Sequence, residues 1–295
     1  MSSSNAISST NPTSQATCKL IPYRDPWQMA KPRFWDIDDQ PLQEFIDTGQ
    51  FIYHDQQVTL TYATHPDTPY FVGHLHARSL KPNFAYQIKL LGKPVSGERG
   101  WGEFGDDISN ERLGKAGRWW EDVAAPPGPN LDDAYYEVNY QNAAPGQKRT
   151  IYGYLYMGAF VTDEQGNADV DFSSRYSYHI CWQDKQTKGQ REVVAGDYTV
   201  QSTTAPYYGY GHPVEPRQVK LWYEYQAGRS REVKLPPGTY NCRFLITEET
   251  FHNLMGGMDD LNGGFYQSVL TSEDFDAAGH PDNNPDNDVV FTIGG

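Results

Sequence analysis

The chain has 295 residues, enough for one large domain or two ordinary ones with a sizeable hydrophobic core. Aromatic residues make up 14%, and 27 Gly with 20 Pro supply frequent turns, a composition that favours β-structure over long helices. The formal net charge of −14 disfavours binding to nucleic acid or to an anionic membrane surface, and it is typical of a soluble acidic protein or a cation-binding one.

Signals for membrane insertion or export are not visible in the sequence. No stretch approaches the roughly 20 apolar residues of a transmembrane helix, so we expect no membrane insertion. The first ten residues, MSSSNAISST, have neither the basic region nor the apolar region of a signal peptide. Either the protein stays inside the cell or its export route is hidden, and the compartment remains open.

The first part of the chain changes from a tail to alternating strands. Residues 1–17 are rich in Ser, Asn and Thr and too poor in apolar groups to offset the entropy of ordering, which predicts a disordered tail. Residues 18–95 are predicted to form an irregular lead-in, up to about residue 50, and then a first β-sandwich part, because apolar and polar residues alternate with a period of two from Phe51 onward. The strands expected in it are 58–62, 71–78 and 84–90.

Residues 96–148 break this pattern. They contain a helix candidate at about 109–122 and a Pro/Gly-rich segment, so we interpret them as a long insertion. Residues 149–295 return to short strands and predict a second β-sandwich part with a loop-rich region at 253–288. The strands expected in it are 151–162, 168–172, 176–183, 196–201, 219–225, 240–247 and 289–293, with a hairpin turn at 163–167. The predicted fold is therefore all-β and antiparallel.

Two similar segments mark corners between sheets, Leu80-Lys-Pro-Asn-Phe-Ala-Tyr86 and Leu235-Pro-Pro-Gly-Thr-Tyr240-Asn-Cys242. The first resembles the tyrosine corner of fibronectin type III modules, and the second is similar to the Tyr-x-Cys segment of immunoglobulin domains. The resemblance implies one or two immunoglobulin-like sandwiches, in which each tyrosine hydroxyl bonds back to the backbone of its turn. It also implies a disulfide between Cys181 and Cys242; the alternative is that both are buried thiols that pack as small hydrophobes.

The sequence His74-Leu-His76 is a candidate metal site. A strand projects both imidazoles to one face, where they could bind zinc or copper, and with an open position the metal could activate water or dioxygen. The alternative is a pair of histidines on a solvated face beside Arg78. A third ligand could come from His179, or from His65 or His54.

Oxygen side chains at alternate positions near the C-terminus form a candidate calcium loop. The four are Asp282, Asn284, Asp286 and Asp288. The pattern departs from an EF-hand at its sixth and twelfth positions, Asn287 and Ile293, so a solvated acidic turn is the alternative.

Aromatic loops are the third candidate, because flat rings stack on sugars or form protein interfaces. The candidate rings are Tyr207, Tyr208, Tyr210, Trp101, Trp119 and Trp120. The alternative is that these rings cap the ends of the sandwich and help to fill its core. Glu248 or Glu249 could supply an acid/base carboxylate for glycan processing, although an ordinary exposed turn also explains the pair.

No familiar catalytic motif is present: there is no nucleophile elbow, P-loop, dinucleotide fingerprint or H-E-x-x-H helix. The sequence therefore favours a non-catalytic binding or structural module, which by analogy of fold belongs on a cell surface or in an extracellular assembly. A protein or glycan ligand and self-association are both compatible with it. The alternatives are a metal-binding protein or metal-dependent enzyme centred on the H-x-H pair, and a carbohydrate-binding or glycan-processing domain.

Overall fold

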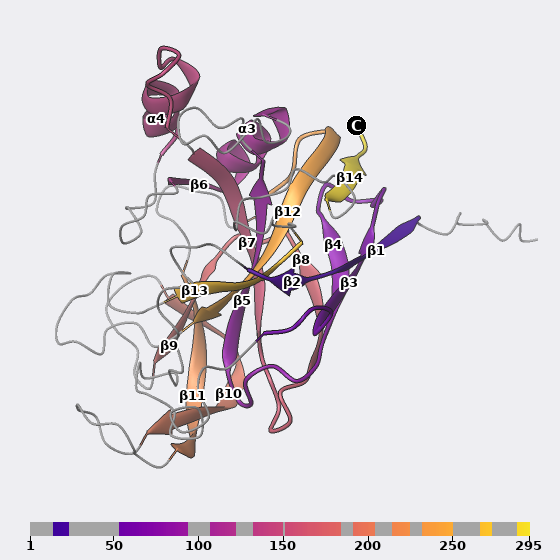
Figure 1. Ribbon diagram of the computed structural model, residues 1–295, viewed down its shortest axis with the longest axis vertical. Helices are drawn as coiled ribbons and strands as arrows, with labels where there is room; N and C mark the ends of the chain where they lie inside the picture. The colour runs from indigo at the N-terminus through magenta and orange to yellow at the C-terminus, as the bar shows by residue number, and fades with distance from the viewer. Residues whose placement is uncertain are drawn as a thin grey trace, which may run out of the picture.

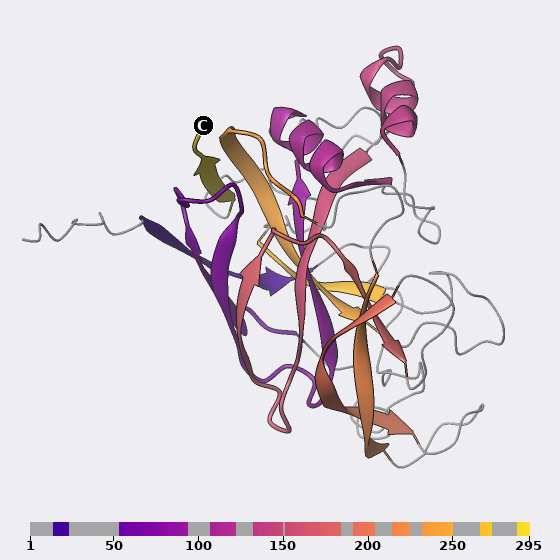
Figure 2. The same cartoon turned by 180° about the vertical axis from the view of Figure 1, so that it is seen from behind.

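The computed structural model describes residues 14–23, 53–93, 107–121, 132–149, 151–183, 191–203, 214–224, 232–249, 266–272 and 288–295. Within these residues every pair of strands is antiparallel, and the strands form three sheets (Figures 1 and 2). The framework is all-β, as predicted. No helix in the described part of the chain is long and apolar enough to cross a membrane.

The largest sheet contains seven strands. In order across the sheet they are β2 (Ile21–Pro22), β13 (Tyr266–Thr271), β12 (Gly238–Glu249), β5 (Ala85–Gly92), β7 (Ile151–Val161) and β6 (Arg118–Glu121), with β14 (Val289–Ile293) also paired to β12. The second sheet has the order β1 (Gln15–Lys19), β3 (Val58–Ala63), β4 (Val72–Ala77) and β8 (Ala168–Ser173). The third has the order β10 (Arg191–Thr203), β11 (Val214–Glu224) and β9 (His179–Gln183).

Strands from distant parts of the sequence share the two larger sheets. Residues 18–95 and 149–295 both contribute strands to each of them, and β6 joins the seven-stranded sheet from within residues 96–148. Strand β1 begins at Gln15, inside the segment predicted as a tail, and pairs with β3.

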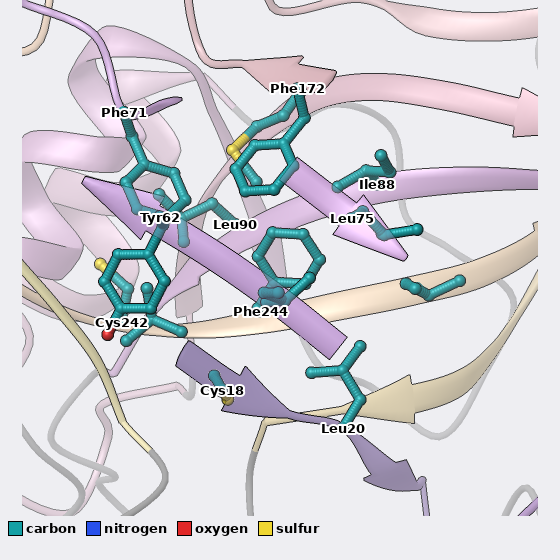
Figure 3. Packing of buried hydrophobic residues seen from close by; sticks show 14 of the residues in the cluster. Cys18, Leu20, Tyr62, Phe71, Leu75, Ile88, Leu90, Phe172, Cys242 and Phe244 are labelled. Atoms are coloured by element: carbon teal, nitrogen blue, oxygen red, sulfur yellow. The ribbon is translucent and has the colours of Figure 1, made fainter. Parts of the chain in front are cut away.

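One core fills the space between the four-stranded and seven-stranded sheets. Alternation along β4 turns Leu75 and Ala77 inward, and both are fully buried. Ile88 of β5 and Phe244 of β12, also fully buried, face Leu75 from the other sheet (Figure 3). Burying each large apolar side chain stabilises the fold by about 1.5–3 kcal/mol. This arrangement is compatible with a β-sandwich.

Both predicted corner tyrosines bond back to their turns. The Tyr86 hydroxyl accepts a hydrogen bond from the backbone N–H of Lys81 at 3.2 Å. The Tyr240 hydroxyl donates to the backbone carbonyl of Pro236 at 2.7 Å. Each bond anchors the first residues of a long central strand, β5 or β12, to the turn that precedes it.

The helical elements lie between β5 and β7 in the sequence. Helix α3 (Asp107–Ala116) falls in the segment where a helix was predicted, but it ends at Ala116 because β6 begins at Arg118. A short α4 (Asp133–Tyr136) continues into a π-helical turn, η1 (Glu137–Gln141). On α3, the buried side chain of Asn110 donates to Ile151 O at 3.0 Å and accepts from Gly153 N at 2.5 Å, which fixes the helix on β7.

Candidate functional site

The outer face of the four-stranded sheet carries four titratable side chains on two neighbouring strands. Because side chains alternate along a strand, the residues that flank Leu75 on β4, His74 and His76, point away from the core. In the register of β4 and β8, His74 lies opposite Asp171 and His76 opposite Asp169. We call these four residues the His–Asp ladder.

Hydrogen bonds fix the charge of His74. Its Nδ1 bonds Asp171 Oδ1 at 2.9 Å, and its Nε2 contacts Asp169 Oδ1. Ionised carboxylates only accept hydrogen bonds, so contacts from both ring nitrogens to carboxylates favour the doubly protonated, imidazolium form of His74. The hydrogen bond that Asp171 accepts from His74 accordingly raises the pKa of His74, with a further contribution from Asp169.

His76 forms hydrogen bonds with Arg78 and with Asp169. Arg78 Nε donates to His76 Nε2 at 2.6 Å, and since a guanidinium can only donate, this nitrogen carries no proton. The other nitrogen, Nδ1, therefore carries the proton and donates to Asp169 Oδ2 at 3.2 Å. The pKa of Asp169 is lowered, chiefly by the hydrogen bond from His76 and further by the one from His74. Both imidazoles thus share the carboxylate of Asp169.

The ladder is exposed but ordered. The exposed fractions of the side chains are 48% for His74, 40% for His76, 62% for Asp169 and 93% for Asp171. On the other side of β4, the uncharged Thr61 and Thr59 of β3 lie opposite His74 and His76. The face therefore presents hydrogen-bonded charges flanked by short polar side chains.

The His–Asp ladder does not form a preformed metal site. All four imidazole nitrogens of His74 and His76 are engaged in hydrogen bonds. Across the described ranges, no group of three or more His, Cys, Asp or Glu residues has a geometry that could hold a metal ion. His179 lies on β9 of a different sheet, with its side chain outside the described part, while His65 and His54 lie in loops on either side of β3.

A second cluster of titratable groups is buried beneath the first tyrosine corner. Lys81 Nζ pairs with Glu248 Oε1 at 2.8 Å, and the two side chains are 0% and 6% exposed. The Tyr53 hydroxyl donates to the same carboxylate oxygen. Because the hydroxyl hydrogen of Tyr53 is donated to Glu248, the Tyr53 oxygen accepts a hydrogen bond from the Tyr86 hydroxyl at 3.0 Å. The hydrogen bonds thus run from Lys81 N–H through two phenols to the carboxylate that pairs with Lys81 Nζ.

This buried cluster corrects the interpretation of Glu248 as part of an exposed turn. Register places Glu248 opposite Tyr86, on the face of β12 that is turned into the sandwich. Burial, and secondarily the Glu248 charge, raise the pKa values of Tyr53 and Tyr86 well above those of ordinary tyrosines, which keeps both phenols protonated as donors. The side chain of Glu249 is outside the described residues.

One of the aromatic candidates is wrong as a ligand-stacking ring. Trp119 is fully buried, stacks on Tyr136 with ring centroids 3.7 Å apart, and donates from Nε1 to Asp133 Oδ1 at 2.7 Å. Trp120 points to the opposite face of β6, where its ring contacts Tyr152. The remaining candidates lie outside the described residues: Tyr207, Tyr208, Tyr210 and Trp101.

The calcium candidates are only partly described. Asp288 forms a buried ion pair with Lys93, with side chains that are 5% and 6% exposed, so its carboxylate does not face solvent as a surface calcium ligand would. Asp282, Asn284 and Asp286 fall outside the described residues.

The two cysteines of the proposed disulfide belong to different sheets. Cys242 carries a buried thiol in the core, as does Cys18, which agrees with a cysteine that packs as a small hydrophobe. Cys181 lies opposite Trp222 in the three-stranded sheet, and its side chain is outside the described residues. The bridge stays a prediction.

Comparison with known proteins gives no relative: no family model, no curated protein and no solved structure matches this chain.

Proposed function

We propose that this chain is a non-catalytic binding module, an immunoglobulin-like or fibronectin type III-like β-sandwich, and that it binds a protein surface through the His–Asp ladder. The observation that carries the proposal is an exposed set of charged side chains already ordered by cross-strand hydrogen bonds. Side chains that are fixed before binding lose little conformational entropy when a partner arrives. The buried Lys81–Glu248 cluster, by contrast, supports a role in the fold.

The partner that the charges favour first is a second copy of the chain. Positive groups, the His74 imidazolium and Arg78, lie on or just after β4, and negative groups, Asp169 and Asp171, lie on β8. A two-fold axis above the ladder would set β8 of one copy over β4 of the other, which is the self-complementarity that a symmetric dimer needs. Because the chain has a net charge of −14, a face with balanced charges also reduces the repulsion between copies.

Sedimentation velocity of the full chain over a concentration series tests this proposal. We expect a reversible dimer that weakens as salt is added, because the contacts are between exposed charges. Asp169→Asn/Asp171→Asn should shift the protein to monomer. The matched control Asp55→Asn/Glu164→Gln removes the same charge from exposed turns outside the ladder and should leave the dimer intact. A wild-type protein that stays monomeric at every concentration would contradict the proposal, as would a ladder variant that dimerises like the wild type.

Metal binding is the second candidate function, favoured by the two carboxylates that lie opposite the two imidazoles. A zinc or copper ion would have to displace the protons of His74 and the guanidinium of Arg78. Elemental analysis of protein purified without a chelating column tests whether the chain binds a metal. Metal that is present in the wild type and lost in His74→Ala/His76→Ala supports a metal site, and wild-type protein without metal rejects it.

A further inference from the structure

The end of β5 meets the start of β14 in a buried contact between an amine and a carboxylate. Lys93 follows β5 directly, and Asp288 directly precedes β14. Lys93 Nζ contacts Asp288 Oδ1, and the two side chains are only 6% and 5% exposed. Neither residue belongs to the His–Asp ladder, so this contact is independent of the proposed function.

Strand pairing fixes the chain neighbours of Lys93 and Asp288. Cys242 of β12 pairs with Gly92 on one side and with Val289 on the other. The residue before Lys93 and the residue after Asp288 are therefore fixed against the same residue of a central strand. Holding two reacting groups together in this way is equivalent to an effective concentration of about 10⁵–10⁸ M when the alignment is good.

The surroundings of the pair differ from those of the other buried lysine–carboxylate pair. The carboxylate of Glu248 also accepts a hydrogen bond from the Tyr53 hydroxyl, in addition to its ion pair with Lys81. Among the described side chains, no second donor bonds the carboxylate of Asp288. Transfer of a proton from a buried ammonium to a buried carboxylate relieves the cost of two desolvated charges and leaves a neutral amine beside a neutral acid.

We propose that Lys93 and Asp288 condense into an amide bond. The lone pair of the neutral Nζ attacks Cγ of the protonated carboxyl group and forms the C–N bond. The C–OH bond then breaks, and the leaving hydroxyl takes a proton from the nitrogen, so one water molecule is released. The step needs no oxidant, reductant or cofactor. The product ties the last strand, β14, covalently to the end of β5 across β12.

Mass spectrometry of the folded full-length chain tests the amide. We expect an intact mass lower than that of the sequence by one water molecule, and a proteolytic digest that contains a branched peptide joining the segments around Lys93 and Asp288. Lys93→Arg keeps the positive charge but removes the nucleophilic amine, so it should restore the full mass. Lys81→Arg is the matched control in the other buried pair, and it should keep the deficit.

Three results would overturn the amide. The first is an intact mass equal to that of the sequence. The second is a loss of water with only linear peptides, as succinimide formation would give. The third is a deficit that persists in Lys93→Arg. The wild-type digest decides the question by itself if Lys93→Arg does not fold.

Discussion

Tyr86 and Tyr240 anchor opposite ends of one antiparallel strand pair. Tyr86 is the second residue of β5 and lies opposite Glu248, near the end of β12, whereas Tyr240 is the third residue of β12. Each hydroxyl bonds to the turn before its own strand. The two corners that look like repeats in the sequence therefore brace neighbouring strands in the centre of the seven-stranded sheet.

The hydrogen bonds of the Tyr86 and Tyr240 hydroxyls should contribute differently to the free energy of unfolding. Tyr240→Phe removes one hydrogen bond to Pro236 O and should lower the free energy of unfolding by about 1 kcal/mol. Tyr86→Phe removes a hydroxyl that serves both Lys81 N and Tyr53, and unsatisfied buried groups cost about 1–3 kcal/mol. Urea unfolding of both variants beside the wild type measures the difference. An equal decrease in the free energy of unfolding for both variants, or a larger decrease for Tyr240→Phe, would contradict this prediction.

The buried pair of Lys81 and Glu248 should behave as a unit. Removing one member leaves an uncompensated buried charge, so Lys81→Met or Glu248→Leu should each cost about 3–5 kcal/mol. The double variant should cost much less than the sum, since no charge is left behind. A double-mutant cycle measured by chemical denaturation checks this.

An additive cycle would mean that the two charges do not depend on each other in the folded protein. Lys115→Met is a suitable reference, because Lys115 pairs with Glu111 on the exposed surface of α3 with side chains that are 48% and 32% exposed. An exposed pair is worth about 0–1 kcal/mol, so this variant should change stability little.

The strands that alternate clearly could be predicted from the sequence, whereas very short strands and one strand inside a polar segment could not. Val289–Ile293 has the predicted bounds, and Val58–Ala63 is one residue longer than predicted. Strands β2 and β6 have two and four residues, too few to establish a period. Strand β13 lies within the Gly/Asp-rich segment predicted as a loop, and its partner β12 is what selects its conformation.

The two histidines of the His–Asp ladder could be predicted from the sequence, but their two aspartate partners could not. The H-x-H spacing predicts that His74 and His76 share one face, but it carries no information about which strand lies beside them. Asp169 and Asp171 have the matching D-x-D spacing, yet only the register of β4 and β8 brings the carboxylates to the imidazoles. The burial of Lys81 was hidden for a similar reason, since its partner Glu248 is distant in sequence.

The contact of helix α3 with β7 requires a glycine. A Cβ at Gly153 would lie 2.2 Å from Asn110 O and 2.3 Å from Gly114 N, both backbone atoms that cannot move aside independently. Gly153→Ala should therefore cost about 3 kcal/mol or more, at the upper end of overpacking effects. Gly294→Ala is the control, because nothing lies within 4 Å of its Cβ position. Thermal unfolding of both variants tests the contact, and a Gly153→Ala protein as stable as the wild type would refute it.

The ladder also predicts a pH dependence centred on His74. Its pKa is raised above the ordinary 6.5, chiefly by Asp171, so protonated His74 favours the folded state. That contribution is complete below pH 6.5 and is lost as the pH rises through the folded pKa. Asp169 has a lowered pKa, so its contribution is present above its ordinary 3.8 and is lost as the pH falls through the folded pKa.

Proton NMR titration of the histidine rings measures the effect directly. The resonance assigned to His74, identified by its absence in His74→Gln, should titrate with a midpoint above 6.5. Asp171→Asn should lower that midpoint, because it removes the carboxylate whose hydrogen bond with His74 makes the largest contribution to the raised pKa. If the proposed dimer uses the His74 charge, it should weaken over the same pH interval in which this resonance titrates. A midpoint at or below 6.5 with Asp171 intact would show that the two side chains do not interact in solution.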